Sequence, residues 1–415
     1  MAKRYVGLVN LPQTELLEPL SYLPLGLLYL GAVLKREGHD VEFLDYSTCK
    51  NLEMIGTTKE YPLPEKDIYL ISATTPLMSK AKSLIEIIKS FYPESKVAIG
   101  GPHITAAPYD GYIAGADIIV TGEGELIIPM IVNHLINGVF SGGLVKNLDK
   151  IPFPARDLLP KEKVQYKGSV HGEIVKGSGA TTIITSRGCP YNCYFCCKTT
   201  MHSRVRYRSP ENVIAEIREL KEKYDIWQYR FVDDCFTVNR KRVETLCDLL
   251  KQEEVYWLAI TRADRVDKPL LEKMYEAGCR EIQIGVETAS PRLLKIINKK
   301  ETVEDYKRAI KHAKEVGLKV KVYLMYGLPG ETEEDIELTK RFMLETQPDK
   351  WTLAKFVPLP GSKFYKEFWK YMIEIPKSFD DYWFYSEEDH PFRQWLKEHF
   401  PWRQDHYKSC KKGEK

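Results

Sequence analysis

Along the first third of the chain, short apolar runs alternate with longer stretches in which apolar and polar residues recur at helical spacing. Short, β-rich apolar runs predict strands, and stretches with apolar residues at helical spacing predict helices. In chain order the expected elements are a strand at 5–9, a helix at 27–35, strands at 41–44 and 68–72, a helix at 80–91, strands at 96–99 and 117–120, and a helix at 126–135. This alternation is typical of the α/β class, here a doubly wound, Rossmann-like parallel sheet whose ligand site lies at the carboxyl ends of its strands.

A second series of strands and helices starts near residue 179. Strands are expected at 182–186, 229–232, 255–260, 281–286, 319–325 and 351–357, with helices between them at 212–224, 241–251, 269–277 and 303–316. Six strand–helix units predict a second parallel sheet, with its site again at the carboxyl ends of the strands.

The segment between the two series is interpreted as a linker. Residues 146–178 carry Pro152, Pro154 and Pro160, many charges and little periodicity. We therefore expect domains at 1–145 and 179–365, joined by this linker and followed by an aromatic C-terminal extension at 366–415.

Composition and charge exclude several classes of protein. The 61 basic and 58 acidic residues leave a formal charge of only +3, which gives no general attraction to nucleic acid or anionic membranes. The longest apolar stretch, 23–34, is too short to span a bilayer, and no signal-peptide pattern follows the N-terminus. We expect a soluble, cytoplasmic protein.

Cysteines point to the chemistry of the chain. Cys189, Cys193 and Cys196 lie on one short loop, with three and then two residues between them. Thiolates are the usual ligands of iron–sulfur clusters, and three of them leave one iron of a cube open to a substrate or cofactor. The alternatives are a zinc site or a disulfide cluster with Cys197 as the fourth thiol. Cys197 adjoins Cys196 and would point away from it, and no second pair has zinc-finger spacing.

The other cysteines fit a reducing compartment better than a disulfide scaffold. We expect all five to be free thiols, namely Cys49, Cys235, Cys247, Cys279 and Cys410.

The cysteine spacing, with aromatic Phe195 just before the last cysteine, resembles the radical S-adenosylmethionine (SAM) superfamily. The resemblance implies that the three thiolates hold a [4Fe–4S] cluster and that SAM chelates its fourth iron. It further implies that reduction, by an external donor of ferredoxin or flavodoxin type, cleaves SAM to methionine and a 5′-deoxyadenosyl radical. The six strand–helix units then resemble the partial (β/α)6 barrel of this family.

The ends of the expected barrel strands carry polar groups in the order that the family uses to bind SAM. The resemblance assigns the amino group of SAM to the aspartate pair after the second strand, for which a helix cap or a solvated loop is the alternative. An arginine after the third strand would pair with a carboxylate. The remaining contacts would go to the ribose, methionine and adenine. The implied SAM contacts are Phe195, Asp233, Asp234, Arg262, Glu287, Thr288, Gly327, Phe356 and Val357.

Three turns at the strand ends of the first sheet, 72–76, 100–105 and 121–125, suggest a second cofactor. Each alone is as well explained as an ordinary strand-to-helix turn. In their order along the chain, the stretch 25–30, the Gly-Gly-Pro-His turn and the Gly-Glu-Gly-Glu turn together resemble the cobalamin-binding domain found ahead of many radical SAM domains. The resemblance implies cobalamin contacts at Thr75, Gly100, Gly101, His103, Gly122 and Gly124. The motif Asp-x-His-x-x-Gly, which supplies a cobalt ligand elsewhere, is missing. A turn histidine without partners is more often structural or exposed. We expect cobalamin without a histidine on cobalt, and the alternative that none is bound stays open.

The aromatic extension can line an apolar pocket or form a packed lid over the open side of the barrel, and we favour the lid. The overall prediction is a cobalamin-dependent radical SAM enzyme that methylates an unactivated carbon of a small-molecule or peptide substrate. The alternatives are a non-methylating cyclase or rearrangement enzyme and a non-catalytic cobalamin or iron–sulfur sensor. A methylthiotransferase is disfavoured, because its N-terminal domain needs cysteine ligands and this one has only Cys49.

Overall fold

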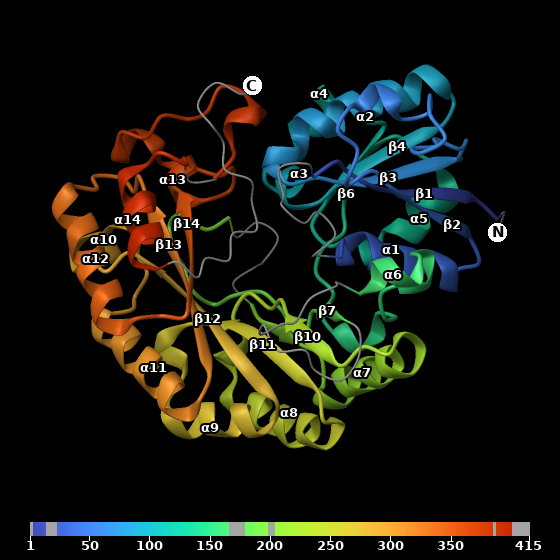
Figure 1. Cartoon of the computed structure of the whole chain (residues 1–415). Helices are drawn as coiled ribbons and strands as arrows, with labels where there is room; N and C mark the ends of the chain where they lie inside the picture. Colours follow the sequence, from blue (N-terminus) through green and yellow to red (C-terminus); the bar gives the residue numbers. More distant parts are fainter. Residues whose placement is uncertain (1–2, 14–22, 166–178, 198–203, 385–386, 401–415) are drawn as a thin grey trace.

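A computed structural model describes residues 3–13, 23–165, 179–197, 204–384 and 387–400. Within them lie two six-stranded parallel sheets, each with helices packed against it (Figure 1). No helix among these residues is long and apolar enough to cross a membrane.

The first sheet has the strand order β2-β1-β3-β4-β5-β6, with every neighbouring pair parallel. Its strands are β1 Tyr5–Asn10, β2 Asp40–Asp45, β3 Ile68–Ser72, β4 Lys96–Gly100, β5 Ile118–Thr121 and β6 Gly138–Ser141. One face packs against α1 (Leu25–Arg36) and α5 (Ile128–His134), and the other against α2 (Met78–Phe91). Two shorter helices follow β4, namely α3 (Pro102–Ala106) and α4 (Pro108–Ile113). Because the order reverses beside β1, this is the doubly wound sheet that the sequence predicts.

The second sheet is curved and runs β7-β10-β11-β12-β13-β14, again all parallel. Its strands are β7 Ala180–Ile183, β10 Gln228–Phe231, β11 Tyr256–Thr261, β12 Cys279–Glu287, β13 Lys319–Tyr326 and β14 Lys350–Lys355. The helices surround its outer face in Figure 1: α7 Pro210–Tyr224, α8 Arg240–Glu253, α9 Lys268–Glu276, α10 Pro291–Ile296, α11 Val303–Val316 and α12 Glu333–Thr346. The six units therefore form a partial barrel with β7 and β14 at its two edges, as predicted.

Capping residues explain where the barrel helices begin. Ser209 and Asp267 cap α7 and α9, each followed by a proline in the first turn, where the missing N–H is not needed. α11 and α12 start at threonine–aspartate capping boxes. Gly317, with φ 93°, ends α11 in the left-handed region.

The structure differs from the expected elements at three places. The strand β6 was not predicted, because it is a four-residue edge strand that is only half buried. The expected helix at 126–135 is a 3₁₀ turn (Gly124–Leu126) followed by the short α5. The expected strand at 182–186 ends at Ile183, and the chain then forms a small antiparallel pair, β8 (Ser186–Arg187) with β9 (Arg206–Tyr207).

The described part of the predicted linker is packed rather than loose. It contains the 3₁₀ turns Leu148–Lys150 and Arg156–Leu158 and the short helix α6 (Lys161–Val164). Leu148, Leu159 and Val164 are buried in one apolar core that continues from α1 to the barrel helices. Residues 166–178 of the predicted linker lie outside the described part of the chain.

The C-terminal extension is also packed. It comprises α13 (Lys363–Lys366), η8 (Phe368–Tyr371), η9 (Phe379–Asp381) and α14 (Pro391–His399). α14 is tied to β14 by the indole N–H of Trp351, which donates to the carbonyl of Phe400 at 3.0 Å. At η9, the ring of Phe379 meets the edge of His103 in the first domain, with 5.3 Å between centroids. The extension therefore reaches from the barrel to the N-terminal domain, in the manner of the packed lid that we favoured.

A buried charge triad attaches the linker to the barrel. The Glu216 carboxylate on α7 accepts from Arg156 Nη1 of the linker at 2.6 Å and also from Arg208 Nη1. Burial alone would raise the pKa of Glu216, but the two guanidinium groups outweigh it and lower that pKa below its usual value. The carboxylate is therefore charged at neutral pH and is the shared counter-charge of two buried cations.

Replacing Glu216 with Ala should destabilise the protein by about 3–5 kcal/mol, because it leaves two guanidinium groups buried without their counter-charge. Urea unfolding monitored by tryptophan fluorescence measures this. Glu219→Ala is the matched control on the same helix, since Glu219 is 39% exposed and pairs with Lys223. It should change stability by less than about 1 kcal/mol. Equal effects of the two substitutions would show that the triad does not hold the linker.

Candidate functional site

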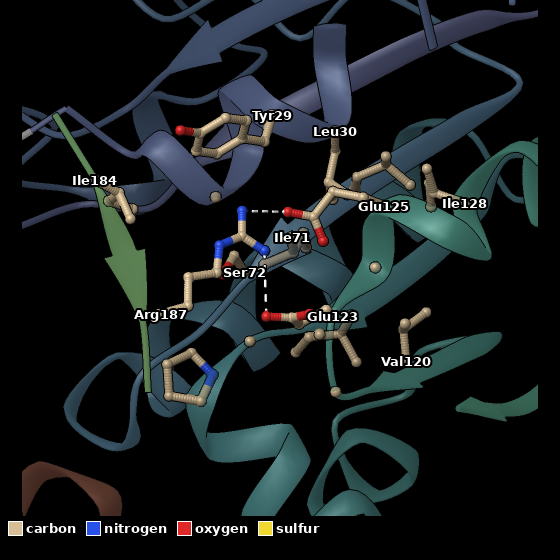
Figure 2. Close-up of a pocket in the computed structure, with 18 of the residues that line it drawn as sticks. Tyr29, Leu30, Ile71, Ser72, Val120, Glu123, Glu125, Ile128, Ile184 and Arg187 are labelled. Atoms are coloured by element: carbon tan, nitrogen blue, oxygen red, sulfur yellow. Dashed lines mark hydrogen bonds and ion pairs between the residues drawn. The ribbon is translucent and has the colours of Figure 1, made fainter. Parts of the chain in front are cut away.

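A cavity of about 350 Å³ lies between the two sheets, and the carboxyl ends of both line it (Figure 2). Ser72, Gly100 and Gly122 reach it from the ends of β3, β4 and β5. Gly188 and Asp234 reach it from the barrel side. The edges at which parallel sheets bind ligands therefore face each other across one space.

Two arginines of the barrel and two glutamates of the first domain form a domain-bridging ion-pair cluster beside this cavity. Figure 2 shows Arg187 between Glu123 and Glu125. Arg187 Nη2 lies 2.7 Å from Glu125 Oε1, and Arg187 Nη1 lies 3.3 Å from Glu123 Oε1. Arg206 donates to both oxygens of Glu123, at 2.5 and 2.8 Å. Burial would raise the pKa of Glu123, but the arginines and the Val145 N–H outweigh it and lower that pKa. Glu123 is thus ionised at neutral pH, and its ion pairs hold the two domains together.

Arg187 is also held by an aromatic ring. Its guanidinium carbon lies 5.1 Å from the ring centroid of Tyr29 on α1, within the range of a cation–π contact. Burial raises the pKa of Tyr29 to about 12, so that hydroxyl stays protonated. The sequence analysis assigned no role to Tyr29, Glu123, Glu125 or Arg206. For Arg187, the one sequence feature that pointed to a role at the site was its position two residues before Cys189.

Four of the six predicted cobalamin contacts line the cavity: Gly100, Gly101, Gly122 and Gly124. Gly101 has φ 98°, and a Cβ there would lie 2.7 Å from Ser72 Oγ, so only glycine fits. Gly26 on α1 also lines the cavity; it belongs to the stretch 25–30 that carried the resemblance but was not among the predicted contacts, and a Cβ there would meet nothing within 4 Å. On the side of the first domain the glycines therefore leave stretches of backbone exposed to the cavity, between side chains such as Leu30 and Ile128, and a ligand can approach this backbone closely.

The other two predicted cobalamin contacts, Thr75 and His103, are buried and do not line the cavity. His103 Nδ1 lies 3.0 Å from Thr75 Oγ1, and His103 Nε2 lies 2.9 Å from Asp110 Oδ2. Burial lowers the pKa of His103, with Asp110 acting in the opposite direction. Both ring nitrogens are engaged within the protein, so His103 has a structural role and is not directed at a ligand.

The cysteine loop, residues 187–197, is clamped from two sides. The Gly188 N–H donates to Asp234 Oδ2 at 3.0 Å. On the other side, the Tyr194 N–H donates to the carbonyl of Ile297 at 2.9 Å, and Asn298 Nδ2 donates to the carbonyl of Asn192 at 2.6 Å. The loop conformation is therefore set by segments far away in the sequence.

The thiols of this loop divide into two groups. Cys189, Cys193 and Cys196 are half-buried, and burial raises the pKa of Cys193 while Lys299 and Arg262 oppose that shift. Cys197 donates its S–H to the carbonyl of Pro360 at 2.9 Å, directed away as expected.

In the described part of the chain, no three His, Cys, Asp or Glu side chains converge on a single metal ion. A cube is a different case, because each thiolate binds its own iron.

The expectation of free thiols outside the loop is confirmed for Cys49, Cys235, Cys247 and Cys279, all of them buried. Cys410 lies outside the described residues.

The two aspartates after β10 have different surroundings. Asp233 is buried and accepts from the Thr185 N–H and hydroxyl and from the Ser186 hydroxyl, at 2.5–2.6 Å. The Asp233 carboxylate therefore fixes the segment that follows β7 through these hydrogen bonds. Asp234 is open to the cavity but surrounded by protein, and burial, with a smaller contribution from Asp233, raises the pKa of Asp234 to about 6. Of the pair, Asp234 is the one that can accept from a ligand.

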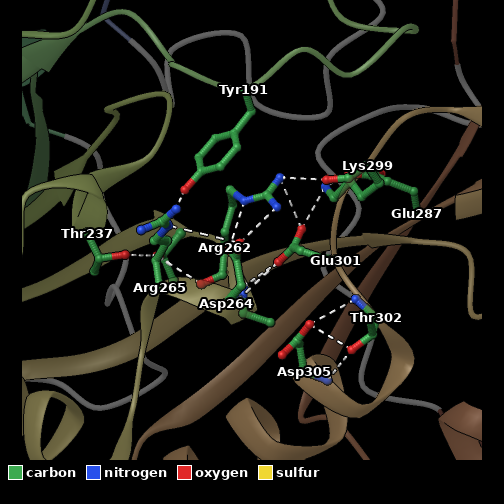
Figure 3. A network of polar contacts seen from close by, with 12 residues as sticks. Tyr191, Thr237, Arg262, Asp264, Arg265, Glu287, Lys299, Glu301, Thr302 and Asp305 are labelled. Carbon is green, nitrogen blue, oxygen red and sulfur yellow. Dashed lines mark hydrogen bonds and ion pairs between the residues drawn. The ribbon is translucent and has the colours of Figure 1, made fainter. Parts of the chain in front are cut away.

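A network of charges lies behind the cysteine loop (Figure 3). Arg262 donates to Asp264 at 2.9 Å and lies 3.4 Å from Glu301, and the ring of Tyr191 is 3.7 Å from its guanidinium carbon. Lys299 Nζ lies 3.1 Å from Glu287 Oε1 and 3.7 Å from Glu301 Oε2. Arg262 and Glu287, predicted as SAM contacts, are thus each paired inside the protein.

Local backbone geometry accounts for the position of Glu287. It has φ 62° and follows an irregularity in the β12–β13 register. A Cβ at Gly285 would lie 2.4 Å from Glu287 Oε1, so a larger residue there would displace the Glu287 carboxylate from its present position. Lys299 and Glu301 were not predicted, because they follow α10 rather than a strand end.

The remaining predicted contacts lie at three strand ends. Thr288 is buried and accepts from the Ser290 N–H at 3.1 Å. Gly327, with φ 76°, donates its N–H to Glu331, and burial raises the pKa of Glu331 to about 7. The Phe356 and Val357 side chains are largely buried.

Aromatic contacts connect the last strand end to the cysteine loop. The ring of Phe356 packs edge-on against Phe364 at 5.4 Å, and Phe364 packs against Tyr194 at 5.9 Å. Phe195, the predicted adenine neighbour, packs against the core, and Lys299 Nζ lies 5.9 Å from its ring centroid.

Comparison with known proteins agrees with this geometry. Residues 183–343 match the family described as the Radical SAM superfamily, and residues 19–132 match the B12 binding domain. An uncharacterized methyltransferase of Pyrococcus horikoshii is 33% identical over 84% of this chain and 78% of its own length. An anaerobic magnesium-protoporphyrin IX monomethyl ester cyclase of Rubrivivax gelatinosus is 28% identical over 84% of this chain, which spans 66% of that protein.

Among solved structures, the radical S-adenosylmethionine methyltransferase TsrM of Kitasatospora setae, with cobalamin and a [4Fe–4S] cluster bound, superposes with a TM-score of 0.69. The match covers 87% of this chain and 74% of TsrM at 18% identity, which establishes the shared fold. The resemblance predicted from the cysteine loop and the glycine turns is confirmed. The chain belongs to the radical SAM superfamily, in the group whose members carry a B12 binding domain ahead of the radical SAM domain.

Proposed function

We propose that the protein is a cobalamin-dependent radical SAM methyltransferase that methylates an unactivated carbon of a small molecule or peptide. The single observation that carries the proposal is the shared cavity, lined by the carboxyl ends of both sheets. Methyl transfer to an unreactive carbon needs one group to remove a hydrogen and another to supply the methyl, both within reach of the same atom. Two parallel sheets that face each other across one space meet that requirement.

The residues present suit the two cofactors. When bound, the cluster and SAM supply a 5′-deoxyadenosyl radical and methylcobalamin supplies the methyl group. Cys189, Cys193 and Cys196 would hold the cluster on a loop clamped in place. Asp234 would accept a hydrogen bond from the SAM ammonium, which is favoured while its carboxylate is ionised, above a pKa of about 6. The bare backbone at Gly100, Gly101, Gly122 and Gly124 would lie against cobalamin.

The polar network behind the loop would act mainly by positioning. Lys299 and Arg262 place two cations near Cys193, and Glu287 and Glu301 hold both cations in place. Positive charge beside a thiolate favours its ionised form, which is the form that binds iron. An external donor of ferredoxin or flavodoxin type would supply the electron for SAM cleavage.

A non-methylating reaction is the second candidate. The relative from Rubrivivax gelatinosus is named a cyclase and aligns with 84% of this chain, as much as the methyltransferase from Pyrococcus horikoshii does. The identity is higher to the methyltransferase, 33% against 28%, which favours methylation.

Anaerobically reconstituted protein should bind about four irons and four sulfides. Cys189→Ala, Cys193→Ala or Cys196→Ala should each abolish reductive cleavage of SAM, because an iron loses its protein ligand. Cys197→Ala is the matched control and should keep full iron content, since its S–H is directed to Pro360. Iron analysis and 5′-deoxyadenosine formation measure this, and loss of the cluster in the Cys197 variant would contradict the ligand assignment.

Electron paramagnetic resonance of bound cob(II)alamin should lack nitrogen superhyperfine splitting from an axial protein ligand. The physical reason is that Thr75 and Asp110 already engage both ring nitrogens of His103. His103→Gln should give the same spectrum. Nitrogen splitting in the wild type that disappears in this variant would mean that His103 binds cobalt.

Turnover should produce two products of SAM. Holoenzyme incubated with dithionite, a metabolite extract and SAM carrying a CD3 group should form 5′-deoxyadenosine and S-adenosylhomocysteine in step with a CD3-labelled product. In methyl transfer, one SAM would be consumed as the source of the radical and a second as the source of the methyl group. Mass spectrometry follows all three species. Formation of 5′-deoxyadenosine without S-adenosylhomocysteine or label would rule out methyl transfer and favour cyclisation or rearrangement.

A further inference from the structure

The C-terminal extension exposes an apolar patch formed by Phe368, Trp369 and Met372. Their exposed fractions are 40%, 62% and 92%. The Phe368 and Trp369 rings pack edge to face, with 5.5 Å between centroids. Three large apolar side chains that gather at the surface within five residues are typical of an interaction site.

The segment that carries the patch packs directly on the cysteine loop. Phe364 and Tyr371 lie 5.9 and 6.5 Å from the ring centroid of Tyr194, and the Phe364 N–H donates to the carbonyl of Tyr194 at 3.0 Å. Tyr194 stands between Cys193 and Cys196. One layer of aromatic rings therefore separates the surface segment from the loop that carries the cluster cysteines.

Lysines flank the patch residues in the sequence. Residues 363–377 contain four lysines and two glutamates, which gives this segment a positive charge. Lys366 is exposed, Lys363 Nζ lies 4.0 Å from the ring centroid of Tyr194, and Lys370 Nζ lies 3.1 Å from Glu367 Oε2. An apolar centre with a charged rim is the usual anatomy of a transient protein interface.

The proposed function requires a partner with matching chemistry. Cleavage of the sulfonium C–S bond of SAM into methionine and a 5′-deoxyadenosyl radical takes up one electron, so a one-electron donor is oxidised by one electron for each cleavage. Electron transfer between proteins slows steeply with distance, which favours a docking surface close to the cysteine loop. Redox encounters use small interfaces, and lysines steer acidic partners to them.

Resting on that proposed function, we propose that Phe368, Trp369 and Met372, with the flanking lysines, form the docking surface for an acidic one-electron carrier protein. The apolar side chains form the contact and the lysines supply the attraction. Tyr194, Phe364 and Tyr371 connect the contact to the cysteine loop.

The test compares two reductants on the reconstituted holoenzyme. Flavodoxin, kept reduced by its reductase and NADPH, is the acidic protein donor, and dithionite is a small reductant that needs no docking surface. The readouts are the rate at which the cluster absorbance bleaches after mixing and the rate of 5′-deoxyadenosine formation. Lys366→Glu/Lys370→Glu reverses the rim charge, and Trp369→Ser/Met372→Ser removes the apolar contact.

Both variants should lose about tenfold or more of the flavodoxin-driven rate and keep the dithionite-driven rate within about twofold. For the wild type, raising salt from about 50 mM to about 300 mM should slow reduction by flavodoxin, because salt screens the attraction. The charge-reversed variant should no longer be slowed by salt, because its segment repels the acidic donor. Lys251→Glu/Lys311→Glu makes the same change of net charge on α8 and α11 and should behave like the wild type.

Several results would overturn the proposal. Undiminished reduction by flavodoxin in both patch variants means that the donor docks elsewhere. An equal loss with dithionite means that the segment supports the active site rather than a partner. A wild type that dithionite reduces but neither flavodoxin nor ferredoxin does, or patch variants that only shift a monomer–dimer equilibrium, also contradict it. Cluster reduction through the patch without S-adenosylhomocysteine would instead contradict methyl transfer and leave this proposal standing.

Discussion

The arrangement of the two domains depends on one electrostatic constraint, the pairing of Arg187 with Arg206. They stand opposite each other in the small β8–β9 pair, where two like charges repel. Glu123 and Glu125 of the first domain supply the opposing charges, and Glu123 bonds to both arginines. The β8–β9 pair is therefore neutralised only when the domains are docked, which couples a local feature of the barrel to the architecture of the whole chain.

The same contact positions the site. Arg187 lies two residues before Cys189, so docking of the N-terminal domain orients the start of the cysteine loop. Gly188, which follows Arg187, donates its N–H to Asp234. At the other end of the loop, Ile297 and Asn298 form hydrogen bonds with the loop backbone. Three segments from three parts of the chain thus fix one loop, which is the rigid support that a site with exacting geometry needs.

Several polar residues at the strand ends serve the protein itself. Asp233 is saturated by Thr185 and Ser186, and Arg262 and Glu287 belong to a network of cations and carboxylates with Lys299 and Glu301. Buried charges are stable only when they are paired in this way. The network is therefore preorganised in the folded protein. Asp234, outside this network, is a carboxylate that remains open to the cavity. The strand-end motifs of the family therefore contain two kinds of residue: those that contact a ligand and those that support the ligand-contacting side chains.

Sequence alone determined the features that are written in local patterns and spacings. Strand β3 and helix α11 begin and end where periodicity and caps predict, and the cysteine spacing and glycine turns identified the family, because such signals need no knowledge of distant contacts. Only the tertiary structure decided which aspartate faces the cavity, that both nitrogens of His103 are engaged, and that Glu123 pairs with Arg206, 83 residues away. It also revealed β6, whose half-buried edge carries too weak a pattern. The physical reason is that charge pairing, burial and edge position are properties of surfaces brought together by folding, and no run of neighbouring residues encodes them.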